Sequence, residues 1–336
     1  PDETLGDIRA QFAAYTDCER KLSALMNEEG LADLVALTDE IVARSEASVR
    51  AAIEILPDGT YSDRFTVDGV DKPLEIACAV VIAGNGITVD FAGTSPQVNW
   101  PINSVLNYTQ AYASYALKCL LDPDAPNNAG SLAPITVTAP EGCLLNALPP
   151  APVWGRHLSG HYVPPAIFGA LAPLLSDRIV GESGSPLWNV YFAGQQDNGS
   201  RFVKMFFMNG GHGARPNGDG PGCLSFPSNV SNQPIEAFEN QVPILVTEKR
   251  LIPDTGGVGR FRGGNAQRIG FRSLNSAPLT MTIRHERVSY PARGLLGGGP
   301  GSPGLDLVNG ERIAAKSRTE LALGDEVIFQ TPGGGG

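Results

Sequence analysis

The chain has 336 residues, 42% of them hydrophobic and 18% charged, which is the balance of a globular protein with room for one large or two ordinary domains. Its net charge of −10 and the lack of any Lys/Arg-rich block argue against a nucleic-acid-binding protein. The 40 glycines and 27 prolines argue against a helical bundle and predict many turns and short strands.

Cysteine usage and the chain ends bear on the cellular context. The five cysteines are scattered and form no C-x-x-C pair, which predicts reduced, mostly buried thiols in a cytoplasmic protein. No secretory signal peptide occurs, and the longest apolar stretch, 76–83, has only the length of a strand. The chain begins at Pro1 without a methionine and stops in a tetraglycine, so we expect a fragment of a longer protein.

Residues 1–145 are predicted to form a helical and mixed α/β region. Apolar residues at helical spacing predict two helices, over 5–29 and 32–56, and Gly30 ends the first. The other elements predicted here are strands over 74–82, 87–91 and 135–138, and a helix over 103–121 that Asn103 caps.

Residues 146–233 are predicted to be a connecting segment. Its elements are a short helix over 165–175, a hairpin of strands 187–193 and 202–208 around Asn198-Gly199, and a Gly-rich loop over 209–233. A structureless loop of that length in a compact domain is typically functional or forms an interface.

Residues 234–336 are predicted to be almost wholly β, with Gly/Pro turns between the strands. The strands are predicted over 244–251, 267–272, 279–284, 305–308 and 326–330. The fold class is therefore α+β: an N-terminal helical pair and mixed α/β region precede a β-rich C-terminal region with long Gly/Pro loops.

The Gly-rich loop after residue 209 contains the best candidates for catalysis. It brings His212, Arg215 and Asp219 close together in sequence, which supplies an imidazole, a guanidinium and a carboxylate. His212 would transfer a proton, and the loop backbone would face an anion. The alternative is a turn-rich surface loop, or a loop that packs against a partner.

A second Gly-rich run, 254–264, contains the candidates for binding a substrate or intermediate. Asp254, Arg260 and Arg262 lie among five glycines, and a guanidinium is suited to carboxylate or phosphate. The run lacks the lysine and helix of a phosphate loop, so its alternative role is a turn that fixes local architecture. We expect Asp254 to form an ion pair with Arg262 or Arg260.

Weaker motifs occur elsewhere. Asp90 ends a predicted strand, where it would either contact substrate or cap a turn. His157 and His161 have the i, i+4 spacing of a metal pair, but Gly155, Gly160 and Pro164 argue against a helix there and no third ligand follows. The sequence therefore predicts no metal site in this chain. No serine lies in G-x-S-x-G, and the run 297–301 resembles a nucleotide fingerprint only in composition.

A collinear series of segments resembles the C-terminal portion of the B subunit of the hydantoinase/oxoprolinase family. The segments are 6–11, 56–61, 90–97, 101–104, 122–124, 128–130, 210–215, 232–236, 254–264 and 331–336. The family includes ATP-dependent N-methylhydantoinase, 5-oxoprolinase, caprolactamase, and the acetone and acetophenone carboxylases. Each segment is weak alone, whereas the whole series in order is specific.

The resemblance implies a heteromeric enzyme. An A-type subunit would bind ATP and Mg²⁺ and phosphorylate an amide, lactam or bicarbonate oxygen, and the B subunit would complete the reaction. The family's metal ligands, for Zn²⁺ or Mn²⁺, lie upstream of the segment that matches 6–11, so they have no counterparts here. The resemblance thus implies an isolated chain that is inactive.

Three functions remain open from the sequence. The first is part of an ATP-dependent amidohydrolase that opens a hydantoin-like, oxoproline-like or lactam ring, and the second is part of an ATP-dependent ketone carboxylase. The third is a non-catalytic structural or interface module of such a complex. Motifs that the whole family shares do not separate these functions.

Overall fold

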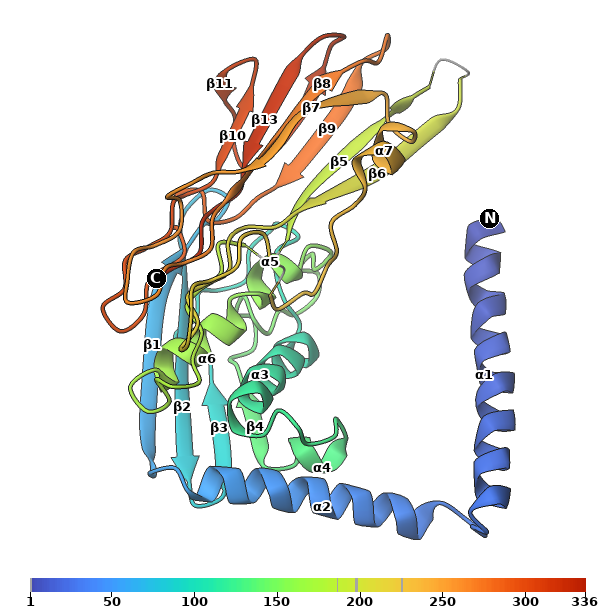
Figure 1. The fold of residues 1–336 in the computed structure, drawn as a ribbon, viewed down its shortest axis with the longest axis vertical. Helices are drawn as coiled ribbons and strands as arrows, with labels where there is room; N and C mark the ends of the chain where they lie inside the picture. The colour runs from blue at the N-terminus through green and yellow to red at the C-terminus, as the bar shows by residue number, and fades with distance from the viewer. Residues whose placement is uncertain (1, 186, 197–198, 225) are drawn as a thin grey trace.

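Two long helices lead into the fold. The computed structural model describes residues 2–185, 187–196, 199–224 and 226–336. Helix α1 (Asp2–Glu28) stands apart from the rest of the protein, and α2 (Val35–Glu54) runs from it to the base of the body (Figure 1). Gly30 lies between them with φ +65°, a left-handed conformation that suits a glycine after a helix end. Both predicted helices are thus present.

The first body is a sheet covered by helices. Its strands pair in the order β1-β2-β3-β4, antiparallel except for the parallel β3–β4 pair. Apolar side chains of this sheet form one core with those of α3 and α6, for example Ile76, Leu117 and Ile167. The elements are β1 (Gly59–Val67), β2 (Leu74–Ala83), β3 (Gly86–Asp90), β4 (Ile135–Thr138), α3 (Leu106–Leu121) and α6 (Val163–Leu171).

The second body contains two further sheets (Figure 1), and their apolar side chains form a second core. A five-stranded sheet has the order β11-β10-β13-β8-β7, and a four-stranded sheet has the order β12-β9-β5-β6. Side chains alternate between the two faces along strand β9. Leu279, Met281 and Ile283 are buried and form its inner face, while the residues between them are partly exposed. The strands are β5 (Trp188–Gln195), β6 (Arg201–Met208), β7 (Ile244–Leu251), β8 (Gln267–Ser273), β9 (Leu279–Arg284), β10 (Leu305–Val308), β11 (Glu311–Arg312), β12 (Lys316–Leu321) and β13 (Glu326–Gln330).

The chain passes repeatedly between these sheets. Strand β5 pairs with β6 on one side and with β9 on the other, so residues from 146–233 and from 234–336 share one sheet. The division at 145 and 233 remains a prediction. The α+β fold class is confirmed, with the helices concentrated toward the N-terminus and the strands toward the C-terminus.

Extended glycine-rich segments lie side by side near the junction of the bodies. Gly334 N donates to Gly264 O at 3.0 Å, and Gly264 N donates to His212 O at 2.6 Å. A Cβ on Gly334 would lie 2.0 Å from His212 O, and one on Gly213 would lie 1.9 Å from Gly181 O. These glycines permit close backbone contact between segments, which the interpretation of the runs as turns or loops did not include.

Several local predictions were wrong for identifiable reasons. Helix α3 begins after Val105, because the buried Asn103 side chain instead accepts from Val98 N and donates to three carbonyls of nearby loops. A one-turn helix, α5 (His157–Gly160), forms where the glycines argued against one. Helices α4 (Ala129–Leu132) and α7 (Ile235–Glu239) and strands β11 and β12 were not predicted.

The cysteines are more exposed than the sequence predicts. Cys78 and Cys143 are buried but Cys18 and Cys119 are exposed, so the thiols are not mostly buried. Asn198 of the predicted hairpin turn lies outside the described residues. No described helix has the length and apolar character needed to cross a membrane.

Candidate functional site

The two Gly-rich loops that the sequence singled out lie next to each other. Gly220 N donates to Arg262 O at 2.7 Å, and Arg262 N donates to the Asp219 carboxylate at 2.8 Å. Arg215 Nε donates to Asp219 O at 3.1 Å. Asp219 therefore connects the loop that holds Arg215 to the loop that holds Arg260 and Arg262.

Arg215 and Arg260 line one cleft of about 400 Å³, which we call the arginine cleft. Gly297 and Gly298, from the run that resembles a nucleotide fingerprint, also line it. The Arg260 guanidinium lies over the Phe261 ring at 5.4 Å. Two permanently charged forks in one cleft suit a carboxylate or phosphate group.

His212 lies within the packed glycine segments. Its side chain is buried, with Nδ1 2.6 Å from Gly213 O and the ring edge-on to Phe226 at a centroid distance of 5.4 Å. Burial lowers the pKa of His212, the bond to Gly213 acts in the opposite direction, and Arg215 adds to the lowering. A neutral imidazole at neutral pH has the protonation state of a general base.

The remaining predicted residues lie at less enclosed positions. The predicted ion pair between Asp254 and Arg262 is confirmed at 3.6 Å, but the side chains are 87% and 66% exposed, so solvent screens it. Backbone bonds hold the run instead, including Gly263 N to Gly257 O at 2.9 Å. Asp90 is apart from the cleft and accepts from Ala92 N and the Thr138 hydroxyl, which is a turn-capping arrangement.

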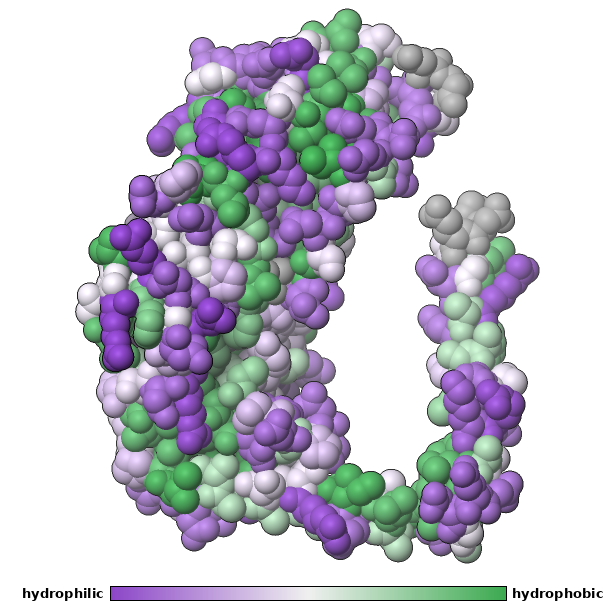
Figure 2. Space-filling view, in the orientation of Figure 1, coloured by the Kyte–Doolittle hydropathy of each residue, from purple (hydrophilic) through white to green (hydrophobic). Residues whose placement is uncertain are grey.

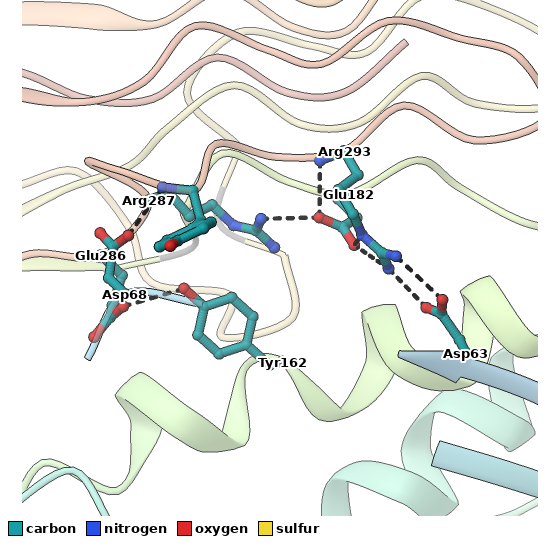
Figure 3. Close-up of polar contacts among 8 residues, drawn as sticks. Asp63, Asp68, Tyr162, Glu182, Glu286, Arg287 and Arg293 are labelled. Atoms are coloured by element: carbon teal, nitrogen blue, oxygen red, sulfur yellow. Dashed lines mark hydrogen bonds and ion pairs between the residues drawn. The ribbon is translucent and has the colours of Figure 1, made fainter. Parts of the chain in front are cut away.

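A chain of ion pairs joins the two bodies, and it is most buried at Glu182 and Arg287. Glu182 accepts from Arg287 Nη1 at 2.8 Å and from Arg293 Nε at 2.7 Å, and Arg293 also pairs with Asp63 on β1 at 2.6 Å (Figure 3). Burial alone would raise the pKa of Glu182, but the guanidiniums of Arg287 and Arg293 outweigh it and hold that pKa below its usual value. Arg287 has φ +63°, a conformation that costs a bulky residue energy.

Glu286 anchors a second buried polar group beside this chain. It accepts from the Tyr162 hydroxyl at 3.1 Å and pairs with Lys316 at 2.8 Å (Figure 3 shows its position relative to Tyr162). Burial raises the pKa of Glu286 to about 7, against the opposing effect of Lys316. Asp68 accepts from the backbone N–H groups of residues 288–290, so strand β1 is tied to the same segment.

A narrow cavity of about 20 Å³ lies between α6 and this segment, lined in part by His161, Tyr162, Ser183 and Glu286. A volume of that size holds about one water molecule. The Ser183 hydroxyl is buried and has no hydrogen-bond partner among the described residues. The cavity can therefore accept a water but is too small for a cyclic substrate.

His157 and His161 do lie on one helical turn, with ring centroids 5.6 Å apart. Asn189 Nδ2 contacts His157 Nε2 at 3.1 Å, and no group of three or more His, Cys, Asp or Glu in the described part of the chain is arranged to hold a metal ion. Burial, with Arg284 and Arg156, lowers the pKa of His157 to about 4, and burial lowers that of His161 well below its usual value. The donor set here does not fit a metal centre.

Comparison with known proteins places the chain in a family. The family described as Hydantoinase B/oxoprolinase matches residues 1–336. The chain belongs to this family. An uncharacterized protein of Methanocaldococcus jannaschii is 31% identical over 100% of this chain and 59% of its own length. The B subunit of a putative D-/L-hydantoinase of Pseudomonas sp. strain NS671 is 34% identical over 79% of this chain and 47% of its own length.

A solved structure confirms the fold of this hydantoinase B/oxoprolinase family member. The ATP-dependent caprolactamase from Pseudomonas jessenii superposes with a TM-score of 0.84 over 98% of this chain and 60% of that chain, at 23% identity. The chain therefore spans less than two-thirds of the length of the relatives described here. At that identity the structural likeness establishes the fold alone.

Sequence reasoning missed the buried ion pairs of this family member. Asp63, Glu182 and Arg293 are far apart in sequence, and only the fold brings them together. One signal was present: His285-Glu286-Arg287 places three ionisable residues directly after the apolar strand β9. Charged residues that continue a buried strand need hydrogen-bond or ion-pair partners. This run therefore indicates that a buried polar cluster lies at the junction of the two bodies.

Proposed function

We propose that this chain is part of the B subunit of an ATP-dependent amidohydrolase that opens a hydantoin-like, oxoproline-like or lactam ring through a phosphorylated intermediate. The proposal is supported by membership of the hydantoinase B/oxoprolinase family and by relatives named as a hydantoinase B subunit and as 5-oxoprolinase. In this proposal an A-type partner supplies ATP and Mg²⁺, and the divalent metal, Zn²⁺ or Mn²⁺, is held outside these residues. The location proposed for the enzyme is the cytoplasm.

The arginine cleft is the part of this chain that we assign to the reaction. Arg215 and Arg260 come from separate loops, and both line the cleft, which is the observation that carries the assignment. A phosphorylated amide gains negative charge that the intact ring lacks, so paired guanidiniums favour the intermediate over the substrate. Asp219 positions Arg215, and the pair formed by Arg262 and Asp254 lies nearby. We also propose that His212 transfers a proton and that Asp90 contributes to binding.

The test is an assay of the intact complex with a panel of hydantoins, 5-oxoproline and lactams. We expect ring opening that requires ATP and proceeds without bicarbonate. Turnover of a ketone that strictly requires bicarbonate, with no ring opening, would instead identify the carboxylase activity and overturn the proposal.

A further inference from the structure

The lining of the arginine cleft comes from several separate segments of the chain. Gly181, the loop with Ala214 and Arg215, the pair 295–296 and Gly336 all contribute to it. Glycine has no side chain with which to fix its own position, so the shape of such a lining depends on the groups that hold the segments from outside the cleft.

Glu182 holds two of these segments at once. Its buried side chain accepts from Arg293 N at 2.9 Å and from Arg293 Nε at 2.7 Å, two residues before the lining at Leu295 (Figure 3). Its backbone carbonyl accepts from Gly335 N at 2.8 Å, directly before the lining at Gly336. One residue therefore fixes both segments relative to each other.

The loop that contains Arg215 is tied to the same place. Gly181 N donates to Ala214 O at 2.7 Å, and Ala214 N donates to Gly335 O at 2.8 Å. A Cβ on Gly335 would lie 1.9 Å from Arg293 O, so these segments are in close backbone contact. The position that is fixed at the buried carboxylate is thus transmitted to the residue directly before Arg215.

The Glu182 carboxylate is itself firmly held. It accepts charge-assisted hydrogen bonds from both Arg287 and Arg293, and such bonds are shorter and stronger than neutral ones. Glu182 and Arg287 are buried, so their contact does not depend on what lies against the surface, where hydrophilic and hydrophobic residues are mixed (Figure 2). A buried, doubly bonded carboxylate is the kind of support that keeps a functional site in one geometry.

We propose that Glu182 is a positioning residue of the arginine cleft, which holds the segments of Arg293, Gly335 and Ala214 so that the Arg215 guanidinium keeps its place in the cleft. This inference rests on the proposed function. Glu182 does not line the cleft, so it acts through these segments and not by touching the substrate. A misplacement of about 1 Å in a binding group can lower a rate by about a hundredfold.

A double-mutant cycle in the intact complex tests this role. Glu182→Gln should lower kcat/KM at least about tenfold, but it should add less than about threefold when the complex already carries Arg215→Gln. A general loss of folded protein would instead lower turnover by the same factor in both backgrounds. Size-exclusion chromatography gives the amount of assembled complex, and kcat/KM is expressed per assembled complex.

The matched control is Asp63→Asn on β1. This substitution removes the other ion-pair partner of Arg293 but leaves the bonds between Arg293 and Glu182 in place. It should leave kcat/KM per assembled complex unchanged. If the Glu182→Gln complex does not assemble, Glu182→Asp takes its place, because it keeps the charge and withdraws the carboxylate by one methylene. We expect the same coupling to Arg215→Gln.

The outcomes separate this inference from the proposed function. If Arg215→Gln itself leaves turnover unchanged, the assignment of the cleft to the reaction fails, and the positioning role fails with it. If Arg215→Gln lowers turnover but the Glu182 variant acts by the same factor in both backgrounds, or by no more than Asp63→Asn does, only the positioning role is overturned.

Discussion

Glu182 and Arg287 form an ion pair of 2.8 Å between side chains that are only 1% and 6% exposed. The two residues are 105 positions apart, and their contact fixes the segment after β9 against the glycine segments. Because Arg293 shares the same carboxylate and reaches Asp63 on β1, this one glutamate connects the two bodies.

Removing the Glu182 charge should destabilise the protein strongly. Glu182→Gln leaves the buried guanidinium of Arg287 without its counter-ion and leaves Arg293 with Asp63 alone, which costs about 3–5 kcal/mol. Urea unfolding followed by fluorescence measures the loss. The control Glu326→Gln removes an exposed pair with Arg272 and should change the unfolding free energy far less. Equal effects of the two substitutions would show that the junction does not depend on Glu182.

The packed glycine segments should not tolerate a methyl group. Gly213→Ala places a Cβ 1.9 Å from the backbone oxygen of Gly181, and backbone in adjacent extended segments cannot move aside cheaply. We expect a loss of more than about 3 kcal/mol, beyond ordinary overpacking, or failure to fold. Gly6→Ala, which meets nothing within 4 Å on α1, should be neutral or stabilising by about 1 kcal/mol. Unchanged thermal unfolding of the Gly213 variant would refute the close packing.

Stability should fall on acidification partly because of His157. Its pKa is about 4 in the folded protein and about 6.5 when unfolded, so the unfolded chain binds more protons between these values. The stability that neutral His157 contributes is complete above pH about 6.5 and is lost progressively as the pH falls toward about 4. His157→Gln should therefore flatten the dependence of unfolding free energy on pH in this window. An identical slope in the variant would contradict the assigned pKa.

The arginine cleft should matter to turnover rather than to assembly. Arg215→Gln or Arg260→Gln removes a charge-assisted bond worth about 1.5–3 kcal/mol, so kcat/KM in the intact complex should fall between about tenfold and about a hundredfold. Arg318→Gln, an exposed arginine on β12, serves as the control. If both cleft variants retain full turnover while deletion of the loop prevents assembly, the chain acts as a non-catalytic interface module.

The sequence predicted the elements whose signals are local. The long helices, the strands on either side of Gly84 and the alternating strand β9 were predictable, because their hydrophobic spacing resides in adjacent residues. Strand β12 was not predicted, since its residues 316–321 are largely polar and only pairing with β9 orders them. Asn103 was misassigned as a helix cap because its loop partners, such as Pro152, are distant in sequence.

The candidate site was predictable only in its composition. Arg215 and Arg260 could be selected for their charge, but the cleft that they share depends on hydrogen bonds between two loops more than 30 residues apart. Of the partners of Glu182, only Arg287 carried a local signal, as part of the ionisable run that follows β9. Long-range ion pairs follow from topology, which short motifs do not specify.

The most direct test of the central claim is the fate of the ring carbonyl oxygen. A lactam or 5-oxoproline labelled with ¹⁸O at the scissile carbonyl is turned over by the intact complex with ATP, and the inorganic phosphate is analysed by mass spectrometry. If the carbonyl oxygen is phosphorylated and the C–O bond then breaks, ¹⁸O appears in the phosphate. Ring opening that leaves all the label in the product carboxylate would contradict an intermediate that is phosphorylated on the carbonyl oxygen and breaks down by C–O cleavage.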